Sequence, residues 1–337
     1  MLGSFEARLM RFRGLQLEIH PIDWVIVGLL LVAVVVGAAR LRSQQPELYP
    51  LLTQHLSVLA GFLAFAAAAI RWQRSWWVIY ARPVIAAAII YSLYTSLGLL
   101  GMSAMGYRAD AALSRIDAAL FGGTDPTFLI EHWITPARVE LFAFFYVLFL
   151  AYVNLSLVLG ALGRPPLERD QFFTGWVSTY AFCYLGYIFL PAHGPGVFHA
   201  AAYHVPLMGG YFYQLILRTT AATGGELGVF PSLHGGASVY LCNFDLGTNR
   251  LRGLTYVPIV ILIFMATVVL RIHYVIDLIV GTAVALTCRR IGPRVLGRWA
   301  RLRHAEGLPA LPGGEADVLP ALSNIRGGRV TSVLSAY

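Results

Sequence analysis

Two short stretches of the sequence place ionisable side chains where long apolar segments begin. "GVFPSLHGGAS", residues 228–238, contains His234, and "RIHYVIDLIVG", residues 271–281, contains His273 and Asp277. A carboxylate beside one imidazole nitrogen fixes the tautomer and leaves the other nitrogen free to attack. A second histidine can protonate the leaving oxygen and then deprotonate an acceptor. These residue types predict phosphoryl transfer through a histidine.

The residues next to the histidines are suited to holding a phosphate. The backbone N–H groups of Ser232 to Gly235 begin a predicted helix, whose dipole favours an anion at this end. Gly235 and Gly236 would let a phosphate approach the backbone closely. Arg271 supplies a permanent positive charge suited to phosphate oxygens. We therefore expect Ser232, Gly235, Gly236 and Arg271 to bind the substrate phosphate.

Each of these features also has an ordinary structural interpretation. An isolated H-x-x-x-D pair on a helix is more often a local hydrogen bond, and Arg271 alone could extend from the membrane interface to water. The combination favours function, because two antiparallel helices between residues 231 and 271 bring His273 back to the depth of His234. Ionisable groups held within a membrane bundle are costly, which makes them functional candidates.

The composition is that of a membrane protein. Of the 337 residues, 58% are hydrophobic and 12% are charged, whereas a soluble domain carries about a quarter charged residues. The net charge is +8, and all 25 basic residues are arginine. Because these arginines lie mostly between apolar segments, they are expected to set the topology, and a nucleic-acid partner is excluded.

Eight apolar segments are predicted to cross the membrane as helices. They are residues 24–39, 52–70, 84–102, 139–162, 172–190, 231–246, 256–271 and 274–289. Several are shorter than the roughly 20 residues that a perpendicular helix needs, so their ends must include flanking aromatic or polar residues. The sequence thus predicts an all-α, polytopic integral membrane protein with about eight transmembrane helices.

The distribution of arginine predicts the orientation in the membrane. With the N-terminus inside, the inner segments are 1–23, 71–83, 163–171, 247–255 and the tail. The positive-inside rule then places both termini in the cytoplasm and the two histidines on the extracytoplasmic side. Arg82 is interpreted as an inner arginine and Asp245 as a helix-end group facing cytoplasmic water. The absence of lysine is typical of a GC-rich bacterial genome, so we expect a bacterial inner (cell) membrane.

Two outer segments differ from the predicted spans. Residues 103–138 mix apolar and charged residues, and we expect a helix lying in the interface, followed by a turn at 122–126. The loop 191–230 is long, and long loops in compact proteins are often functional. Its His193 and His199 are nevertheless expected to be solvated rather than to bind a head group.

The remaining features have structural interpretations. Tyr180, Tyr184 and Tyr187 follow helical spacing and are expected to be packing or interfacial residues rather than part of a substrate site. The three cysteines fall within predicted spans without a C-x-x-C spacing, so they are interpreted as small apolar residues. No clustered set of metal ligands is apparent, so neither a metal nor a cofactor is predicted. Beyond about residue 305 the tail is typical of a disordered chain.

At the two histidine stretches the chain resembles the type-2 phosphatidic acid phosphatase (PAP2) superfamily. "PSLH" matches its P-S-x-H element, and "HYVID" matches its H-x-x-x-D element. "FPSLHGGAS", "RIHYVIDLIVG" and "SRIDAALFGGTDPT" are similar to the branch of fungal inositol phosphorylceramide synthase and its bacterial relatives. The resemblance divides the chain into an N-terminal segment with two extra helices (1–83), a catalytic membrane domain with a six-helix core (84–289) and a basic, then disordered, cytoplasmic tail (290–337).

The resemblance also implies roles for individual residues. His273 would form a phosphohistidine, Asp277 would orient it and His234 would act as general acid and base, without a metal. The chain departs from the superfamily at Thr267, where an arginine is expected six residues before the nucleophile, and it lacks the lysine of the first superfamily element. Outer arginines could complete the phosphate site, the candidates being Arg115, Arg138 and Arg218.

Three functions remain open on the sequence. The branch resemblance favours a lipid head-group phosphotransferase, which would move phosphoinositol or a similar phospho-alcohol from a phospholipid to a lipid alcohol. A lipid phosphate phosphatase acting on phosphatidic acid or a polyprenyl (di)phosphate would use the same histidines with water as acceptor. A non-enzymatic transporter or scaffold is disfavoured, because charged residues cluster near the span ends and no internal repeat is apparent. In the first two cases the partners are membrane lipids.

Overall fold

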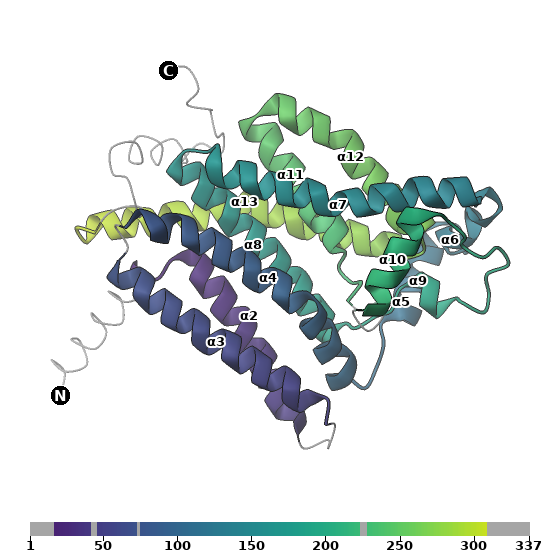
Figure 1. The fold of residues 1–337 in the computed structure, drawn as a ribbon, viewed down its shortest axis with the longest axis horizontal. Coiled ribbons are helices and arrows are strands. Elements are labelled where there is room, and N and C mark those ends of the chain that lie inside the picture. Colours follow the sequence, from purple (N-terminus) through teal and green to yellow (C-terminus); the bar gives the residue numbers. More distant parts are fainter. Residues whose placement is uncertain (1–16, 42–45, 73–74, 223–227, 309–337) are drawn as a thin grey trace.

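The computed structural model describes residues 17–41, 46–72, 75–222 and 228–308, and every regular element in these ranges is a helix (Figure 1). The long helices are α2 (Pro21–Arg40), α3 (Leu48–Arg71), α4 (Trp76–Ala104), α7 (Pro136–Leu162), α8 (Pro166–Phe189), α11 (Leu233–Thr248), α12 (Arg250–Val269) and α13 (Val275–Ala305). Shorter helices lie between them: α5 (Asp110–Leu120), α6 (Pro126–Leu129), the 3-10 turn η2 (Glu131–Trp133), α9 (Pro195–Phe198) and α10 (Tyr211–Ala222). The predicted all-α class is confirmed for this part of the chain.

The number of membrane-spanning helices differs from the prediction. Each of the eight predicted spans falls on one of the long helices, but five of these helices are long and apolar enough to cross a membrane: α2, α3, Trp77–Ala104 of α4, α7 and α12. The predicted spans on α8, α11 and α13 do not meet this criterion, so the prediction of eight is not confirmed. Helix α11 has 16 residues, fewer than the roughly 20 of a perpendicular span. The five apolar helices still indicate a membrane protein.

Helices α8 and α11 form the centre of the bundle. α8 packs against α2, α4, α11 and α13, and α11 packs against α8, α12 and α13. Because neighbouring helices surround α8, it can bury large aromatic side chains. Tyr180, Tyr184 and Tyr187 are at most 3% exposed, which confirms their predicted packing role. The hydroxyl of Tyr184 donates to the Ile90 carbonyl, which satisfies the buried phenol.

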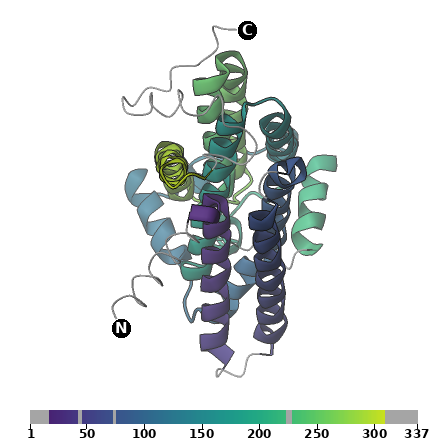
Figure 2. The same cartoon turned by 90° about the vertical axis from the view of Figure 1, so that its left-hand side faces the viewer.

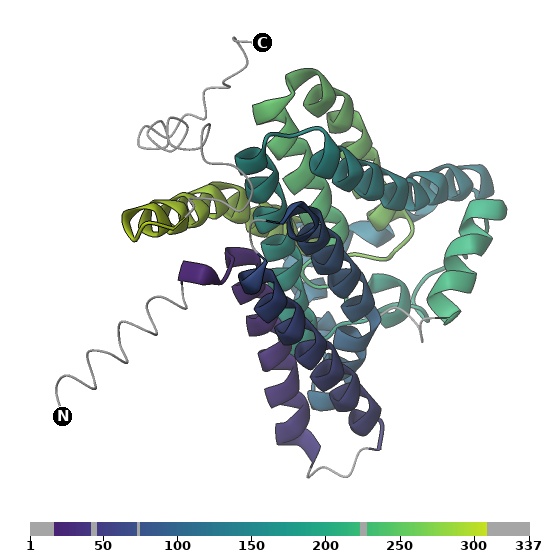
Figure 3. The same ribbon diagram turned by 60° about the vertical axis from the view of Figure 1, so that its left-hand side comes forward.

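The helices nearest the two ends of the chain pack around α8 and α11. Helices α2, α3 and α4 run side by side (Figure 2), and α2 also packs against α8. Helix α13 continues through the predicted boundary at 289–290 to Ala305 and projects beyond the other helices (Figure 3). Near its end, Arg303 donates to the Leu17 carbonyl. The predicted disordered tail after residue 308 and Arg8, Arg11 and Arg13 lie outside the described residues.

Buried ion pairs join the helices at the end of the bundle opposite the two histidines. Arg82 of α4 pairs with Asp23 of α2, with 3.1 Å between Nε and Oδ1. Arg164 and Arg252 both pair with Asp245 of α11. Segments that the arginine pattern assigned to one side of the membrane therefore meet at one end of the bundle. The expectation that Asp245 faces water is wrong, because it is 1% exposed and surrounded by the arginines that balance its charge.

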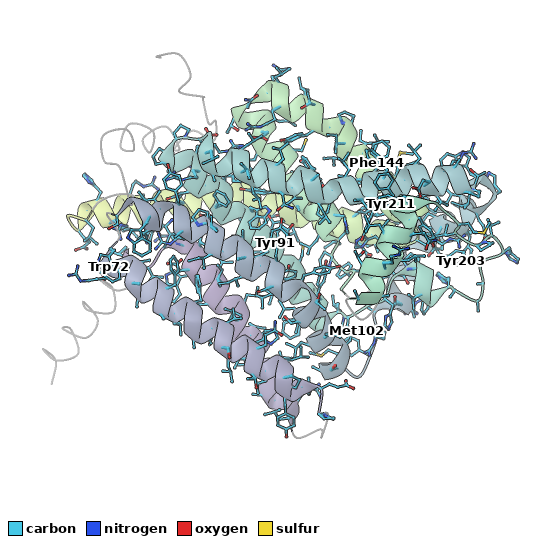
Figure 4. The ribbon with its side chains drawn as sticks, in the orientation of Figure 1. Trp72, Tyr91, Met102, Phe144, Tyr203 and Tyr211 are labelled. Carbon is cyan, nitrogen blue, oxygen red and sulfur yellow. The ribbon has the colours of Figure 1, made fainter. Side chains whose placement is uncertain are left out.

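Short helices gather at the opposite end. α5, α6, α9 and α10 lie there, and Tyr203 and Tyr211 mark this region in Figure 4. The helix predicted within 103–138 is α5, and the predicted turn is made by Gly122 and Gly123, whose φ angles of 73° and 99° favour glycine. Helix α5 packs against α9 and α13, so it belongs to the structure that surrounds the histidines.

Candidate active site

The structure brings His234 and His273 into direct contact. His234 lies in the first turn of α11, and His273 lies in the loop between α12 and α13. His234 Nδ1 is 3.1 Å from His273 Nε2, and His273 Nδ1 is 3.3 Å from Asp277 Oδ2. The predicted return of His273 to the depth of His234 is confirmed, and the three side chains form a continuous chain of hydrogen bonds.

Asp277 meets His273 across the start of a helix, whereas the four-residue spacing predicted contact along a helix face. Helix α13 begins at Val275 with Tyr274 as its N-cap, so His273 precedes the helix. Asp277 Oδ2 also accepts a hydrogen bond from Tyr274 N at 3.0 Å, and the residue is fully buried. One carboxylate therefore fixes both the first turn of α13 and the imidazole before it.

The hydrogen-bond partners determine which nitrogen of each imidazole carries a proton. A carboxylate accepts, so His273 Nδ1 donates to Asp277 and His273 Nε2 presents its lone pair. His234 Nδ1 then donates to His273 Nε2. Burial and the neighbouring His234 lower the pKa of His273 well below its ordinary value, which keeps this imidazole neutral at pH 7. Nε2 of His273 is thus suited to nucleophilic attack.

The start of α11 lies tightly against α13. Ser232 is the N-cap, its Oγ accepts from Gly235 N at 3.1 Å, and its own N–H donates to the Asp277 carbonyl at 3.0 Å. A Cβ on Gly281 would lie 2.4 Å from the Ser232 carbonyl oxygen, so this approach requires glycine. A Cβ on Gly235 or Gly236 would meet α13 or α8 atoms at 3.3 Å. Both glycines therefore serve close helix packing, and their contact with a phosphate stays a prediction.

Aromatic rings of α7 surround the other histidine. The rings of Tyr146 and Phe149 lie 4.5 Å and 4.4 Å from the His234 ring, measured between centroids. His273 is 3% exposed. The reacting nitrogens are therefore enclosed by apolar surface, and an environment of low dielectric strengthens the hydrogen bonds between them.

Arg271 occupies a constrained turn beside His273. Its φ angle is 59°, a left-handed conformation that is uncommon for residues other than glycine. Its NH2 group donates to Glu131 Oε1 at 3.3 Å and to the Val205 carbonyl at 2.9 Å, and the guanidinium lies 3.5 Å over the Tyr203 ring. Glu131 thus balances part of the charge of Arg271. Phosphate binding by Arg271 stays a prediction.

The other candidates for phosphate binding are held elsewhere or lie on the surface. Thr267 is buried, and its hydroxyl donates to the Phe264 carbonyl. Arg115 donates to the Ala111 carbonyl, and Arg138 donates to the Trp133 carbonyl and stacks on that ring, whereas Arg218 is exposed on α10. None of these contacts selects one arginine to complete the phosphate site.

Three buried carboxylates near the histidines were missed in the sequence. Asp110 and Asp117 of α5 and Glu131 of η2 accept hydrogen bonds from backbone N–H groups around the site. Those bound by Asp110 and Glu131 lie in loops, and those bound by Asp117 lie in the first turn of α13. A signal was present, because Asp110 and Asp117 are seven residues apart and lie on the same face of a helix. It was hidden by the interpretation of 103–138 as an interfacial helix, in which charged residues would face water.

The loop histidines also differ from expectation. His199, expected to be solvated, is 18% exposed at its side chain, and its Nε2 lies 2.9 Å from Ser114 Oγ and 3.4 Å from Asp125 Oδ2. His193 is half-buried and lines a cavity of about 870 Å³, together with residues that include Tyr107 and Arg108. His199, through its side chain, and His193, whose backbone N–H donates to Asp110, therefore tie the 191–230 loop to the segment before α7.

Comparison with known proteins identifies the family. The family model of the PAP2 superfamily matches residues 111–289, more than half of the chain, and the match includes both histidines and Asp277. No curated protein and no solved structure matches the chain. With the two histidines in contact and the family match covering them, the chain belongs to the PAP2 superfamily, whose membership indicates a phosphatase- or phosphotransferase-type enzyme acting on lipid phosphates.

Proposed function

We propose that the protein is a membrane-embedded lipid head-group phosphotransferase that works through a phosphohistidine on His273. The observation that carries the proposal is the alignment of His234 Nδ1, His273 Nε2, His273 Nδ1 and Asp277, with contacts of 3.1 Å and 3.3 Å. This arrangement leaves a neutral nucleophile facing a proton donor, which is the pair that phosphoryl transfer through nitrogen requires.

The reaction would proceed in two displacements at phosphorus. In the first, His234 is the imidazolium, protonated on both nitrogens, and its Nδ1 turns from His273 to the substrate. His273 Nε2 then attacks phosphorus, the bond from phosphorus to the departing lipid alcohol breaks, and the alcohol oxygen takes the Nδ1 proton, which leaves His234 neutral. In the second, an acceptor hydroxyl returns a proton to His234 Nδ1 while its oxygen attacks phosphorus. The nitrogen–phosphorus bond then breaks, and the lone pair returns to His273 Nε2. Asp277 holds the His273 imidazole in the reactive tautomer through both steps.

The phosphate would lie at the start of α11. The positive end of that helix dipole favours an anion there, and the hydroxyl of Ser232, whose oxygen accepts from Gly235 N, would donate its proton to a phosphate oxygen. Gly235 and Gly236 would let the phosphate approach the backbone. Arg271 follows the end of α12 and would supply positive charge to the phosphate oxygens. These assignments extend the prediction made from the sequence.

A lipid alcohol, and not water, is the proposed acceptor. The sequence resemblance to the inositol phosphorylceramide synthase branch favours transfer of phosphoinositol or a similar phospho-alcohol. The rings of Tyr146 and Phe149 against His234 and the 3% exposure of His273 support this choice, because they limit access of water to the intermediate. The absence of lysine supports a bacterial cell membrane. The distribution of arginine supports an orientation with both termini in the cytoplasm and the histidines on the other side.

The test follows the phosphorus atom of a labelled donor. Purified protein in mixed micelles is given phosphatidylinositol carrying ³²P in its head group, with and without an added lipid alcohol. We expect label on the protein without acceptor and label on the added lipid with it. His273→Ala should abolish both signals, and His132→Ala, which removes an exposed histidine outside the site, should leave them unchanged.

Other outcomes would change the proposal in defined ways. If the lipid alcohol stays unlabelled while phosphatidic acid or a polyprenyl diphosphate releases inorganic phosphate in the same micelles, the enzyme is a phosphatase that uses the same histidines. If the His273→Ala variant retains turnover with any of these donors, the phosphohistidine mechanism itself is wrong.

A further inference from the structure

Helix α5 contributes a buried carboxylate to the start of the helix that carries Asp277. Asp117 is 0% exposed, and its Oδ2 accepts from Val275 N at 2.6 Å while its Oδ1 accepts from Ile276 N at 2.9 Å. These two N–H groups belong to the first turn of α13, where no earlier residue of the helix can accept from them. Asp117 therefore caps the N-terminus of α13, although it is far from that helix in the sequence.

A second carboxylate of α5 holds the other side of the same loop. Asp110 Oδ1 accepts from Gly194 N at 2.9 Å and from the Tyr274 hydroxyl at 3.2 Å. Gly196, two residues after Gly194, donates from its N–H to the Arg271 carbonyl at 2.7 Å. Helix α5 thus binds the segment 271–276 directly, through Asp117 to Val275 and Ile276 and through Asp110 to Tyr274. It also binds this segment indirectly, through the loop that starts at Gly194.

We infer that Asp117 is a positioning residue of the reaction, which sets the orientation of the His273–Asp277 pair from outside the catalytic helices. This inference rests on the proposed function of His273 as the nucleophile. A carboxylate that accepts two N–H groups at a helix N-terminus makes charge-assisted hydrogen bonds and fixes both the position and the rotation of the first turn. Because Asp117 is fully buried, water cannot replace it.

The expected effect is large, because the loop and the first turn of α13 carry His273 and Asp277, two of the three hydrogen-bonded residues. His273 lies two residues before Val275, and Asp277 lies one residue after Ile276, so the two residues held by Asp117 separate the nucleophile from its orienting partner. A displacement of about 1 Å at a reacting group costs on the order of 10²-fold in rate. A small rotation of this turn would misalign His273 Nε2 with the phosphorus atom.

The chain offers a matched control in the same region. Asp125 is also buried, at 4% exposure, and also caps a helix, since its Oδ1 accepts from Thr127 N at 3.0 Å and from the Thr127 hydroxyl at 2.6 Å. Its hydrogen-bond and ion-pair partners are Thr127 of α6, Ser114 and His199, and none of these lies in segment 271–277. Replacing Asp125 by Asn therefore disturbs a similar carboxylate without releasing the loop that holds His273.

The first measurement separates turnover from binding. Asp117→Asn keeps the size of the side chain, but the amide has one oxygen to accept with, and its NH2 group faces the second backbone N–H. With the donor and acceptor lipids of the transfer assay, we expect kcat to fall roughly 10- to 100-fold while KM changes by less than about threefold. Asp125→Asn should leave both constants within about threefold of the original protein. Equal changes in the two variants would overturn the inference.

The second measurement does not depend on activity. Hydrogen–deuterium exchange of the full-length protein in detergent, read from peptides covering 272–280, reports the amides of Val275 and Ile276. We expect faster exchange there in Asp117→Asn, with the exchange of α7 and α8 peptides unchanged, and no such change in Asp125→Asn. Unchanged exchange in Asp117→Asn would show that Asp117 does not hold the loop.

The two measurements together distinguish this inference from the proposed function. If the original protein labels from phosphatidylinositol and Asp117→Asn has faster exchange but the same kcat, the positioning role is wrong and the function stands. If no lipid donor labels the original protein, the proposed function fails, and the role of Asp117 in that reaction fails with it. If Asp117→Asn has a lower kcat, an unchanged KM and faster amide exchange in 272–280, both the proposed function and the positioning role of Asp117 are supported.

Discussion

Buried carboxylates occur at both ends of the bundle, but they are satisfied in different ways. At the end with the histidines, Asp110 and Asp117 accept hydrogen bonds mainly from backbone N–H groups. At the opposite end, Asp23 pairs with Arg82, and Asp245 pairs with Arg164 and Arg252. The same side-chain type therefore binds loops in one region and joins long helices through arginines in the other.

The difference follows from what each end has to hold. An arginine has a long side chain with many rotamers, so an ion pair joins two helices without fixing either backbone closely. A backbone N–H has no such freedom, so a carboxylate that accepts two of them fixes the local chain. Catalytic groups must be held within about 0.5 Å of the productive geometry. The histidine end therefore needs carboxylates that hold the backbone directly.

Loss of the carboxylate nearest the nucleophile should have the largest effect, and it should act on chemistry. In Asp277→Asn the amide no longer forces the proton of His273 onto Nδ1, so the reactive tautomer loses its advantage. We expect turnover to fall by roughly 10³- to 10⁴-fold, with the thermal unfolding temperature nearly unchanged. Initial rates of lipid labelling and a melting curve of the same preparation test this. A rate within tenfold of the original protein would contradict the role of Asp277.

Loss of a carboxylate at the other end should act on stability instead. Asp245→Asn leaves the buried guanidinium of Arg164 without its ion-pair partner on α11. Breaking a buried pair by removing one partner costs about 3–5 kcal/mol. We expect the free energy of unfolding, measured by titration with a denaturing detergent, to fall by about 3–5 kcal/mol. The kcat of the molecules that remain folded should be retained. A large loss of kcat in the folded fraction would show that the two ends are coupled.

Glu131 binds backbone N–H groups and also pairs with an arginine, so it combines the arrangements of the two ends. Its replacement should have the smallest effect of the three variants. It accepts from His204 N and Val205 N, each at 2.7 Å, and pairs with Arg271. Burial opposes ionisation, but the N–H groups of Val205 and His204 and the charge of Arg271 outweigh it and lower the pKa of Glu131 below its ordinary value of 4.5. Its ionised form therefore stabilises the fold above that ordinary value, and this contribution is lost as the pH falls through the lowered pKa.

The sign of this effect can be measured by unfolding over a range of acidic pH. We expect the unfolding temperature of the original protein to fall more steeply below about pH 4.5 than that of Glu131→Gln. The difference should be equivalent to about 1 kcal/mol or less, because the Glu131 side chain is partly accessible to solvent, which screens its charge. Above pH 5 the difference between the two proteins should be constant. Parallel curves over the whole acidic range would mean that Glu131 has an ordinary pKa.

Much of the site could be predicted because its residues follow patterns that depend on short distances along the chain. The antiparallel helices between residues 231 and 271 predicted that His273 returns to the depth of His234. The four-residue spacing predicted that Asp277 lies within contact distance of His273. The buried tyrosines of α8 were predicted from helical spacing alone. The predicted number of membrane-spanning helices was not confirmed. Helices α8 and α11 are covered by other helices, so their apolar residues serve contacts within the protein as well as contacts with lipid.

The surroundings of the site depended on contacts that local patterns do not contain. Asp117 binds Ile276 across 159 residues of sequence, and Glu131 binds Arg271 across 140. A charged residue in an amphipathic segment is compatible with water or with a buried partner, and only the fold selects between them. The same applies to Asp245, whose position near a helix end favoured water until its arginines were located.

The sequence by itself determined that the protein is a helical membrane protein and that His234, His273 and Asp277 are the residues to examine, because hydropathy and helical period are local properties. The tertiary structure alone decided which carboxylates neutralise arginines and which hold the loop of the nucleophile. Burial of a charge depends on every element packed around it, and that information is distributed over the whole chain.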